Sequence, residues 1–166
     1  PVATSFAIAG IALDQPVSSE AVVLLGRVPL APYALPGTQE VPDSVAPYCK
    51  DYNAVLLANH GALTWGSDLI QAYYRMESLE HYALMLMYTN NIINKVNELS
   101  CDQVSDLITI REKMGITTGG VPPCEIGSSE RIADKQTVPA PSSNKDEMIE
   151  SVVRKVTQEV LGRLVK

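Results

Sequence analysis

The sequence has no apolar run of the roughly 18–20 residues that a membrane-spanning helix needs. It also has no basic segment leading into an apolar one at its start, the pattern of a secretory signal. Positive charge is in short supply, since 13 Lys and Arg residues stand against 19 Asp and Glu residues and the net charge is −6. We therefore expect neither a membrane anchor nor nucleic-acid binding.

Cysteine is scarce, with only Cys49, Cys101 and Cys124 and no CxxC pair. An odd number at wide spacing argues against a disulfide framework and against a zinc ribbon. Such usage is typical of a reducing compartment, so a cytoplasmic location is expected. The sequence also shows no glycine-rich phosphate loop, nucleophile elbow or paired-carboxylate motif.

The 166 residues, of which 46% are hydrophobic, suit one ordinary domain with an appendage. The chain opens with Pro1 rather than Met and runs directly into an apolar segment, which indicates a piece of a longer protein. Composition predicts a folded domain over residues 1–116 and a flexible linker over 117–144, which is rich in Gly, Pro, Ser and Thr. An amphipathic helix is predicted over 145–166.

Apolar runs and turn residues predict the order of elements in the domain. Residues 1–13 are rich in alanine and predict a buried helix that ends at Asp14 and Pro16. Residues 20–26 form a β-branched and aliphatic run, which predicts a strand buried on both faces. An irregular edge or crossing loop over 28–33 and a short helix within 38–48 follow.

The second half of the domain shows the clearer patterns. Residues 53–59 and 62–65 predict two short strands separated by His60 and Gly61. A long helix is predicted from Ser67 and Asp68 to about residue 90, with Ser67 as its cap. Another is predicted over 103–114 and ended by Gly115.

His60 is the main candidate for chemistry. It follows a buried strand in the run LLANHGALTWG, and an imidazole at a strand end can offer a neutral nitrogen to a metal. Gly61 leaves space beside it for a substrate or a cation. One histidine is not a metal site, however, and a structural histidine at the strand end is the competing interpretation.

Other polar residues carry weaker signals. Glu77 and His81 stand four apart on the long helix and could share a ligand face, but apolar neighbours favour a structural polar stripe there. Tyr33 lies in the loop APYALPGT and is a candidate substrate contact.

Three segments together resemble the class II aldolase/adducin family: PVATSFAIAGIA, VPLAPYALPGTQE and AVLLANHGALTWGSDLIQAYYRMESLE. The most specific element is a strand, the NHG sequence at His60, a second strand and a helix opening with Gly66, Asp68 and Ala72. The resemblance extends from Pro1 to about Gly115. The family includes fuculose- and rhamnulose-1-phosphate aldolases and ribulose-5-phosphate 4-epimerases.

The resemblance implies a three-layer α-β-α fold with a mostly antiparallel central sheet, of which this chain has the C-terminal part. It also implies a catalytic Zn²⁺ held by His60, by a His-x-His pair upstream of Pro1 and usually by an upstream glutamate. The phosphate-binding residues and the acid/base glutamate are likewise expected upstream of Pro1, so the chain alone is expected to be inactive.

The activity implied is metal-dependent cleavage of a ketose 1-phosphate of the fuculose or rhamnulose type. The products would be dihydroxyacetone phosphate and a small aldehyde, and the enzyme would be a homotetramer. The family's tyrosine positions are departures here, occupied by Glu20 and Met114, which leaves the sugar open. A pentulose-phosphate 4-epimerase and an adducin-like binding module without catalytic activity are the alternatives.

The tail resembles the encapsulation peptides that carry enzymes into bacterial microcompartments. Asn144 and Glu147 form a capping-box pattern before an apolar stripe at helical spacing. A shell protein is therefore the expected partner of residues 145–166, and the microcompartment interior the expected location. Self-association of the helix, or packing on its own domain, are the competing interpretations.

Overall fold

A computed structural model describes residues 1–124 of the chain. Residues 125–166 lie outside the described part, and with them most of the expected linker and all of the expected helix over 145–166. Within residues 1–124, no helix is long and apolar enough to cross a membrane.

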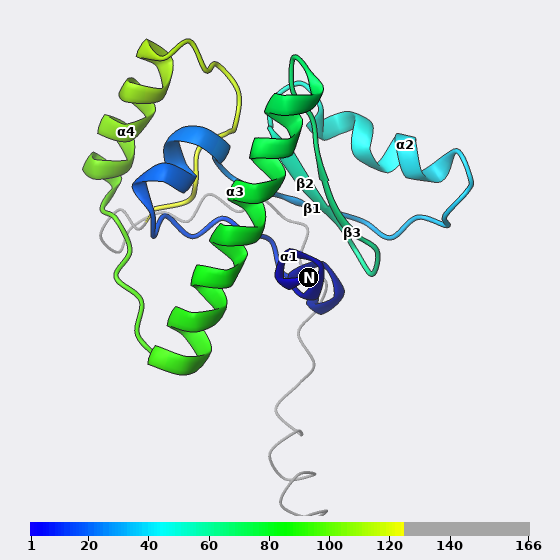
Figure 1. Cartoon of the computed structure of the whole chain (residues 1–166), viewed down its shortest axis with the longest axis horizontal. Coiled ribbons are helices and arrows are strands. Elements are labelled where there is room, and N and C mark those ends of the chain that lie inside the picture. The colour runs from blue at the N-terminus through cyan, green and yellow to red at the C-terminus, as the bar shows by residue number, and fades with distance from the viewer. Residues whose placement is uncertain (125–166) are drawn as a thin grey trace, which may run out of the picture. The chain divides into compact units, whose positions relative to one another are not determined.

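A small mixed sheet lies at the centre of the described residues (Figure 1). Its three strands are β1 (Leu30–Ala31), β2 (Ala54–Leu57) and β3 (Gly61–Thr64), in the order β1-β2-β3. β1 pairs with β2 in parallel, and β2 pairs with β3 antiparallel. Both strands predicted around His60 are therefore confirmed. The three-layer arrangement with a mostly antiparallel sheet stays a prediction.

Helix α1 (Val2–Ala9) confirms the predicted N-terminal helix but ends earlier than expected. Gly10 adopts a left-handed conformation with φ 72° and its amide caps the helix. The helix therefore stops at a glycine and not at Asp14 or Pro16. Leu13 then forms an isolated antiparallel bridge with Val28.

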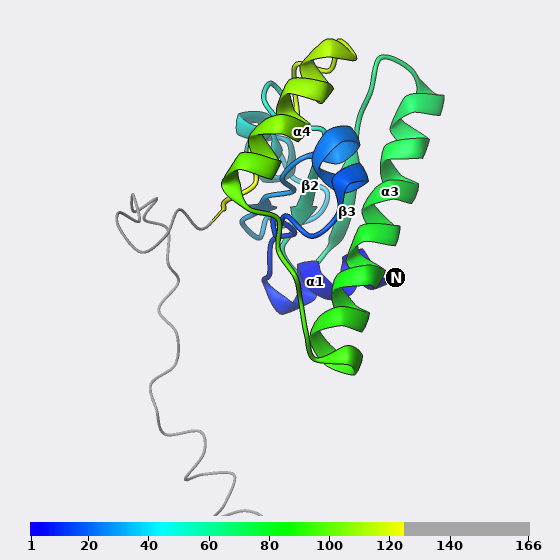
Figure 2. The same ribbon diagram turned by 90° about the vertical axis from the view of Figure 1, so that its left-hand side faces the viewer.

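The strand predicted over residues 20–26 is wrong. The segment forms η1 (Ala21–Leu25), a short π-helical turn in which the Gly26 amide bonds to the Ala21 carbonyl. Its residues Ala21, Val22, Val23 and Leu25 are buried and Leu24 is exposed. The segment packs against α3 (Leu69–Tyr88) and α4 (Cys101–Lys113). η1 lies between these two helices in both views (Figures 1 and 2). A short apolar run is compatible with a strand or with a helical turn, so its sequence could not distinguish the two.

The remaining helices follow the predicted pattern. α2 (Glu40–Val45) and the 3₁₀ turn η2 (Ala46–Tyr48) form the short helix, and η3 (Thr89–Ile93) extends α3. Asp68, not Ser67, is the N-cap of α3, and its carboxylate accepts a 2.8 Å hydrogen bond from the Gln71 amide. α4 begins with a capping box between Ser100 and Gln103.

Strand β2 has apolar neighbours on both of its faces. Ala54 and Leu56 belong to the main core with α1 and α3, whereas Val55 and Leu57 pack near α2 and η2. The fully or nearly buried residues of the main core are Ala3, Ala7, Leu13, Ala21, Leu25, Val28, Ala54, Leu56, Leu79, Tyr82, Ala83 and Leu86. Small residues dominate the α1 side, which lets that helix approach the sheet closely.

The first residues of the expected linker contact the domain. The Gly119 carbonyl accepts a 2.7 Å hydrogen bond from the Arg27 amide, and the Gly119 amide donates to the Asp51 carbonyl at 2.8 Å. A side chain at Gly119 would lie 2.9 Å from both Arg111 and Asn53. Residues 117–124 therefore lie on the body, while the rest of the expected linker is outside the described residues.

A disulfide joins Cys101, at the start of α4, to Cys124. This overturns the expectation that the cysteines argue against disulfide bonding. The two residues are 23 apart in the chain, but the path of the segment after α4 returns Cys124 to within 5.2 Å of Cys101 between Cα atoms. Cys49 is exposed and free.

Candidate functional site

The turn between β2 and β3 presents His60 at the end of the sheet. The His60 amide donates a 3.0 Å hydrogen bond to the Leu57 carbonyl, which closes the turn. Asn59 takes the left-handed conformation with φ 56°, which asparagine tolerates better than most residues. Gly61 then begins β3. The tight connection directs the exposed His60 side chain away from the core.

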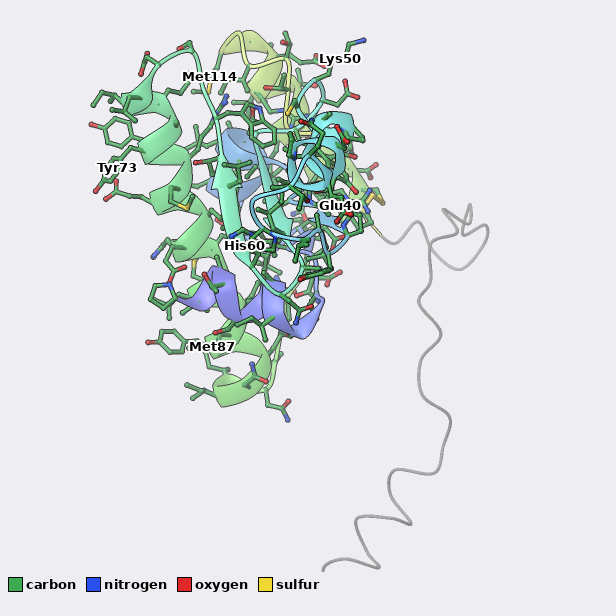
Figure 3. All side chains as sticks on the ribbon, turned by 90° about the vertical axis from the view of Figure 1, so that its right-hand side faces the viewer. Glu40, Lys50, His60, Tyr73, Met87 and Met114 are labelled. Carbon is green, nitrogen blue, oxygen red and sulfur yellow. A yellow bond between two sulfur atoms is a disulfide. The ribbon has the colours of Figure 1, made fainter. Side chains whose placement is uncertain are left out.

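His60 borders a small hollow of about 10 Å³, which is room for little more than one water molecule. The hollow lies between the sheet end, the loop after β1, and α2. Figure 3 labels His60 on the β2–β3 turn, Glu40 on α2 and Tyr73 on α3. The other lining residues are Pro32, Ala34, Val41, Ser44, Leu57 and Ala58.

The geometry suits His60 as one donor to a metal ion. Its imidazole is exposed, and the Cβ position of Gly61 has only the Thr4 hydroxyl near it, at 3.9 Å. Residues 1–124 contain no group of three His, Cys, Asp or Glu side chains placed to hold a metal. The described residues therefore provide a single imidazole that fits a metal, and a complete site needs further donors.

The other candidates lie on the loop after β1 and on α3. Tyr33 is exposed, and its neighbours Pro32 and Ala34 line the hollow, so its loop borders the site. His81 is exposed on α3. Glu77 accepts a 2.8 Å hydrogen bond from the Tyr73 hydroxyl one turn away. This contact engages Glu77 within its own helix.

Glu80 is the residue whose role the sequence did not indicate. Its two carboxylate oxygens accept hydrogen bonds from the amides of Val2 and Ala3, at 2.6 and 2.9 Å. No local pattern in the sequence indicates this contact, because Glu80 lies 78 and 77 residues from its two partners.

Opposing influences act on the pKa of Glu80. Burial raises it, whereas the hydrogen bonds from the Val2 and Ala3 amides lower it. The net result is a pKa below the ordinary value. Glu80 is therefore held as a carboxylate at the positive end of α1.

Helix α1 also contacts the turn that carries His60. The Asn59 amide donates a 3.2 Å hydrogen bond to the Ala7 carbonyl near the end of α1. Thr4, in the first turn of α1, lies beside Gly61. The β2–β3 turn is thus fixed on one side by its own closing hydrogen bond and on the other by α1.

Comparison with known sequences gives a consistent assignment. Residues 1–87 match the profile of the Class II Aldolase and Adducin N-terminal domain. The 3-oxo-tetronate 4-phosphate decarboxylase of Pectobacterium atrosepticum is 32% identical over 93 residues, which are 56% of this chain and 42% of that protein. An L-fuculose phosphate aldolase of Methanococcus maripaludis is 30% identical over 84 residues, 49% of this chain and 46% of that protein. The chain spans less than half the length of these curated relatives.

Solved structures share the fold. YgbL from Klebsiella pneumoniae has a TM-score of 0.58 at 31% identity, over 64% of this chain and 52% of that one. An L-fuculose 1-phosphate aldolase has a TM-score of 0.60 at 27% identity, over 69% of this chain and 51% of that one. The mixed sheet and its helices therefore have the arrangement found in these proteins.

Proposed function

The chain belongs to the class II aldolase and adducin family, and from that premise we propose that it is part of a metal-dependent lyase acting on a phosphorylated sugar. The substrate we propose is a ketose 1-phosphate of the fuculose or rhamnulose type, cleaved to dihydroxyacetone phosphate and a small aldehyde. The observation that carries the proposal is the exposed imidazole of His60, presented by the β2–β3 turn beside Gly61.

In this proposal His60 is one of several ligands of a Zn²⁺ ion. When bound, the zinc would supply Lewis-acid polarisation of the substrate's oxygen atoms. The closed turn fixes the backbone that carries His60, and Gly61 leaves the approach open. The acid/base residue and the remaining ligands belong to parts of the enzyme other than residues 1–124. We propose Tyr33 as a substrate contact, because its neighbours Pro32 and Ala34 line the hollow beside His60.

A second candidate function is decarboxylation of 3-oxo-tetronate 4-phosphate, favoured by relatives that are about a third identical to the chain, such as the Pectobacterium enzyme at 32%. The two reactions share their chemistry. In each, a bond to the carbon next to a carbonyl breaks, and the electron pair stays on that carbon. Protonation then gives dihydroxyacetone phosphate in both cases. The leaving fragment differs: an aldehyde in the aldol cleavage and carbon dioxide in the decarboxylation.

The co-product therefore distinguishes the two candidates. The full-length protein would be incubated separately with L-fuculose 1-phosphate, L-rhamnulose 1-phosphate and 3-oxo-tetronate 4-phosphate. Dihydroxyacetone phosphate with an equal amount of aldehyde supports the aldolase, and the same product with carbon dioxide supports the decarboxylase. Interconversion of pentulose 5-phosphates without dihydroxyacetone phosphate would indicate the 4-epimerase. No turnover of any substrate by zinc-loaded protein would favour an adducin-like binding module.

We further propose that the enzyme is a homotetramer and that residues 145–166 dock onto a microcompartment shell protein. The support for the tail is its sequence alone: an apolar stripe faces one side of the predicted helix, and the polar side mixes acids and bases. A reporter carrying residues 145–166 should co-purify with shells, and Val153→Asp with Val156→Asp should abolish this. Loss of turnover and tetramer assembly in that double variant of the full enzyme would instead place the tail in the catalytic body.

A further inference from the structure

The first amides of a helix have no acceptor within the helix itself. In α1 these include the amides of Val2 and Ala3. Glu80, 78 and 77 residues away in sequence, accepts both. Each carboxylate oxygen accepts one amide, so the contact fixes the orientation of the helix start as well as its position.

The packing of α1 transmits this constraint. Ala3 and Ala7 face the core and are 2% and 0% exposed. They belong to the same cluster as Leu79 and Ala83, which flank Glu80 on α3. Two alanines one turn apart allow close approach of the helices, and a close-packed contact transmits a displacement of α1 to its neighbours.

The other neighbour of α1 is the turn that presents His60. The Ala7 carbonyl holds the Asn59 amide at 3.2 Å. Asn59 is in a left-handed conformation that costs free energy and persists only when its surroundings hold it. A shift of α1 would remove this support from the residue directly before His60.

We propose that Glu80 is a positioning residue, which holds α1 against the β2–β3 turn and thereby sets the orientation of His60 toward its metal. This inference rests on the metal role of His60 proposed above. Glu80 touches neither His60 nor the substrate; it acts through α1 and the Ala7–Asn59 hydrogen bond.

The test uses the full-length, zinc-loaded protein with Glu80→Gln, which keeps the size of the side chain but replaces one acceptor oxygen with an amide donor. Amide hydrogen exchange at Val2 and Ala3 should be faster than in the parent by at least about tenfold, because their hydrogen bonds to a charged acceptor are lost. Exchange at Asn59 should be faster by a similar factor, because a shifted α1 no longer holds its bond to the Ala7 carbonyl. Zinc affinity, measured by competition with a chelator, should fall by about tenfold, as for other groups that orient metal ligands.

Two control variants separate positioning from general destabilisation. Glu77→Gln changes an exposed carboxylate one turn earlier on α3 and should leave exchange at Asn59 and zinc affinity unchanged. Val104 of α4 is 1% exposed. Val104→Ala therefore removes buried apolar volume and lowers the stability of the protein at a place away from α1. If Val104→Ala speeds exchange at Asn59 and weakens zinc as much as Glu80→Gln does, the positioning role is wrong.

The outcome also separates this inference from the proposed function. If the amide of Asn59 exchanges in Glu80→Gln at the rate of the parent, the positioning role of Glu80 is wrong, whatever His60 binds. If His60→Ala weakens zinc but Glu80→Gln does not, the metal role of His60 stands and the positioning role fails. If His60→Ala leaves zinc binding intact, the metal role itself fails.

Discussion

The Thr118 hydroxyl donates a 2.6 Å hydrogen bond to the side-chain oxygen of Asn53, which is fully buried at the start of β2. The Asn53 amide group donates in turn to the Leu25 carbonyl at 3.2 Å. Asn53 therefore connects three separate parts of the chain: the end of η1, the strand that leads to His60, and the segment after α4. Both ends of this amide have partners, as a buried amide requires.

Removing the Thr118 hydroxyl tests this connection. Thr118→Val keeps the shape of the side chain but leaves the Asn53 oxygen without its partner, which should lower the free energy of unfolding by about 1–3 kcal/mol. Chemical denaturation of the chain measures the loss. Thr109→Val is the control, because that exposed hydroxyl bonds only to the Ser105 carbonyl of its own helix. An equal small effect of both changes would contradict the account.

The Cys101–Cys124 bond gives a second prediction. Closing a loop of 23 residues restricts the unfolded chain, and Cys124→Ser should cost about 3 kcal/mol of stability under oxidising conditions. Cys49→Ser, which removes an exposed thiol, should change little. A thiol count under denaturing conditions should find one free thiol in the parent chain. Three free thiols without added reductant would show that the bond does not form.

The depressed pKa of Glu80 predicts a dependence of stability on pH. A carboxyl group whose pKa is lower in the folded state stabilises the protein above its unfolded pKa of about 4.3, and this contribution is lost as the pH falls through the lower folded value. The stability difference between parent and Glu80→Gln should therefore be largest near neutral pH and shrink below about pH 4. Unfolding curves across this range measure it. A stability difference between the two proteins that grows as the pH falls would contradict a lowered pKa of Glu80 in the folded state.

Much of the fold could be predicted because strong local patterns coincide with the elements that form. The apolar run before His60 is bounded by polar residues and forms β2, and the long apolar periodicity after Asp68 forms α3. Gly10 and Gly115 mark helix ends with φ of 72° and 78°. These patterns involve residues that are close in the sequence, so the elements they form could be predicted without knowledge of the tertiary packing.

The errors share a different origin. The run at Ala21–Leu25 forms a π-helical turn that packs against α3 and α4, and its composition alone did not distinguish this turn from a strand. The bond between Cys101 and Cys124 depends on where the chain returns after α4. The role of Glu80 depends on its hydrogen bond with the Val2 amide at the start of α1, 78 residues earlier. None of these partners is near in sequence, so local patterns could not identify them.

The metal content of His60→Ala in the full-length protein tests the central claim most directly, with His81→Ala as the matched control on α3. Loss of a direct ligand should weaken zinc binding by more than the roughly 10–100-fold expected for groups that only orient ligands, and turnover should fall with it. His81→Ala should retain the zinc and activity of the parent. A His60→Ala protein with full zinc occupancy and full turnover would contradict the assignment of His60 as a metal ligand.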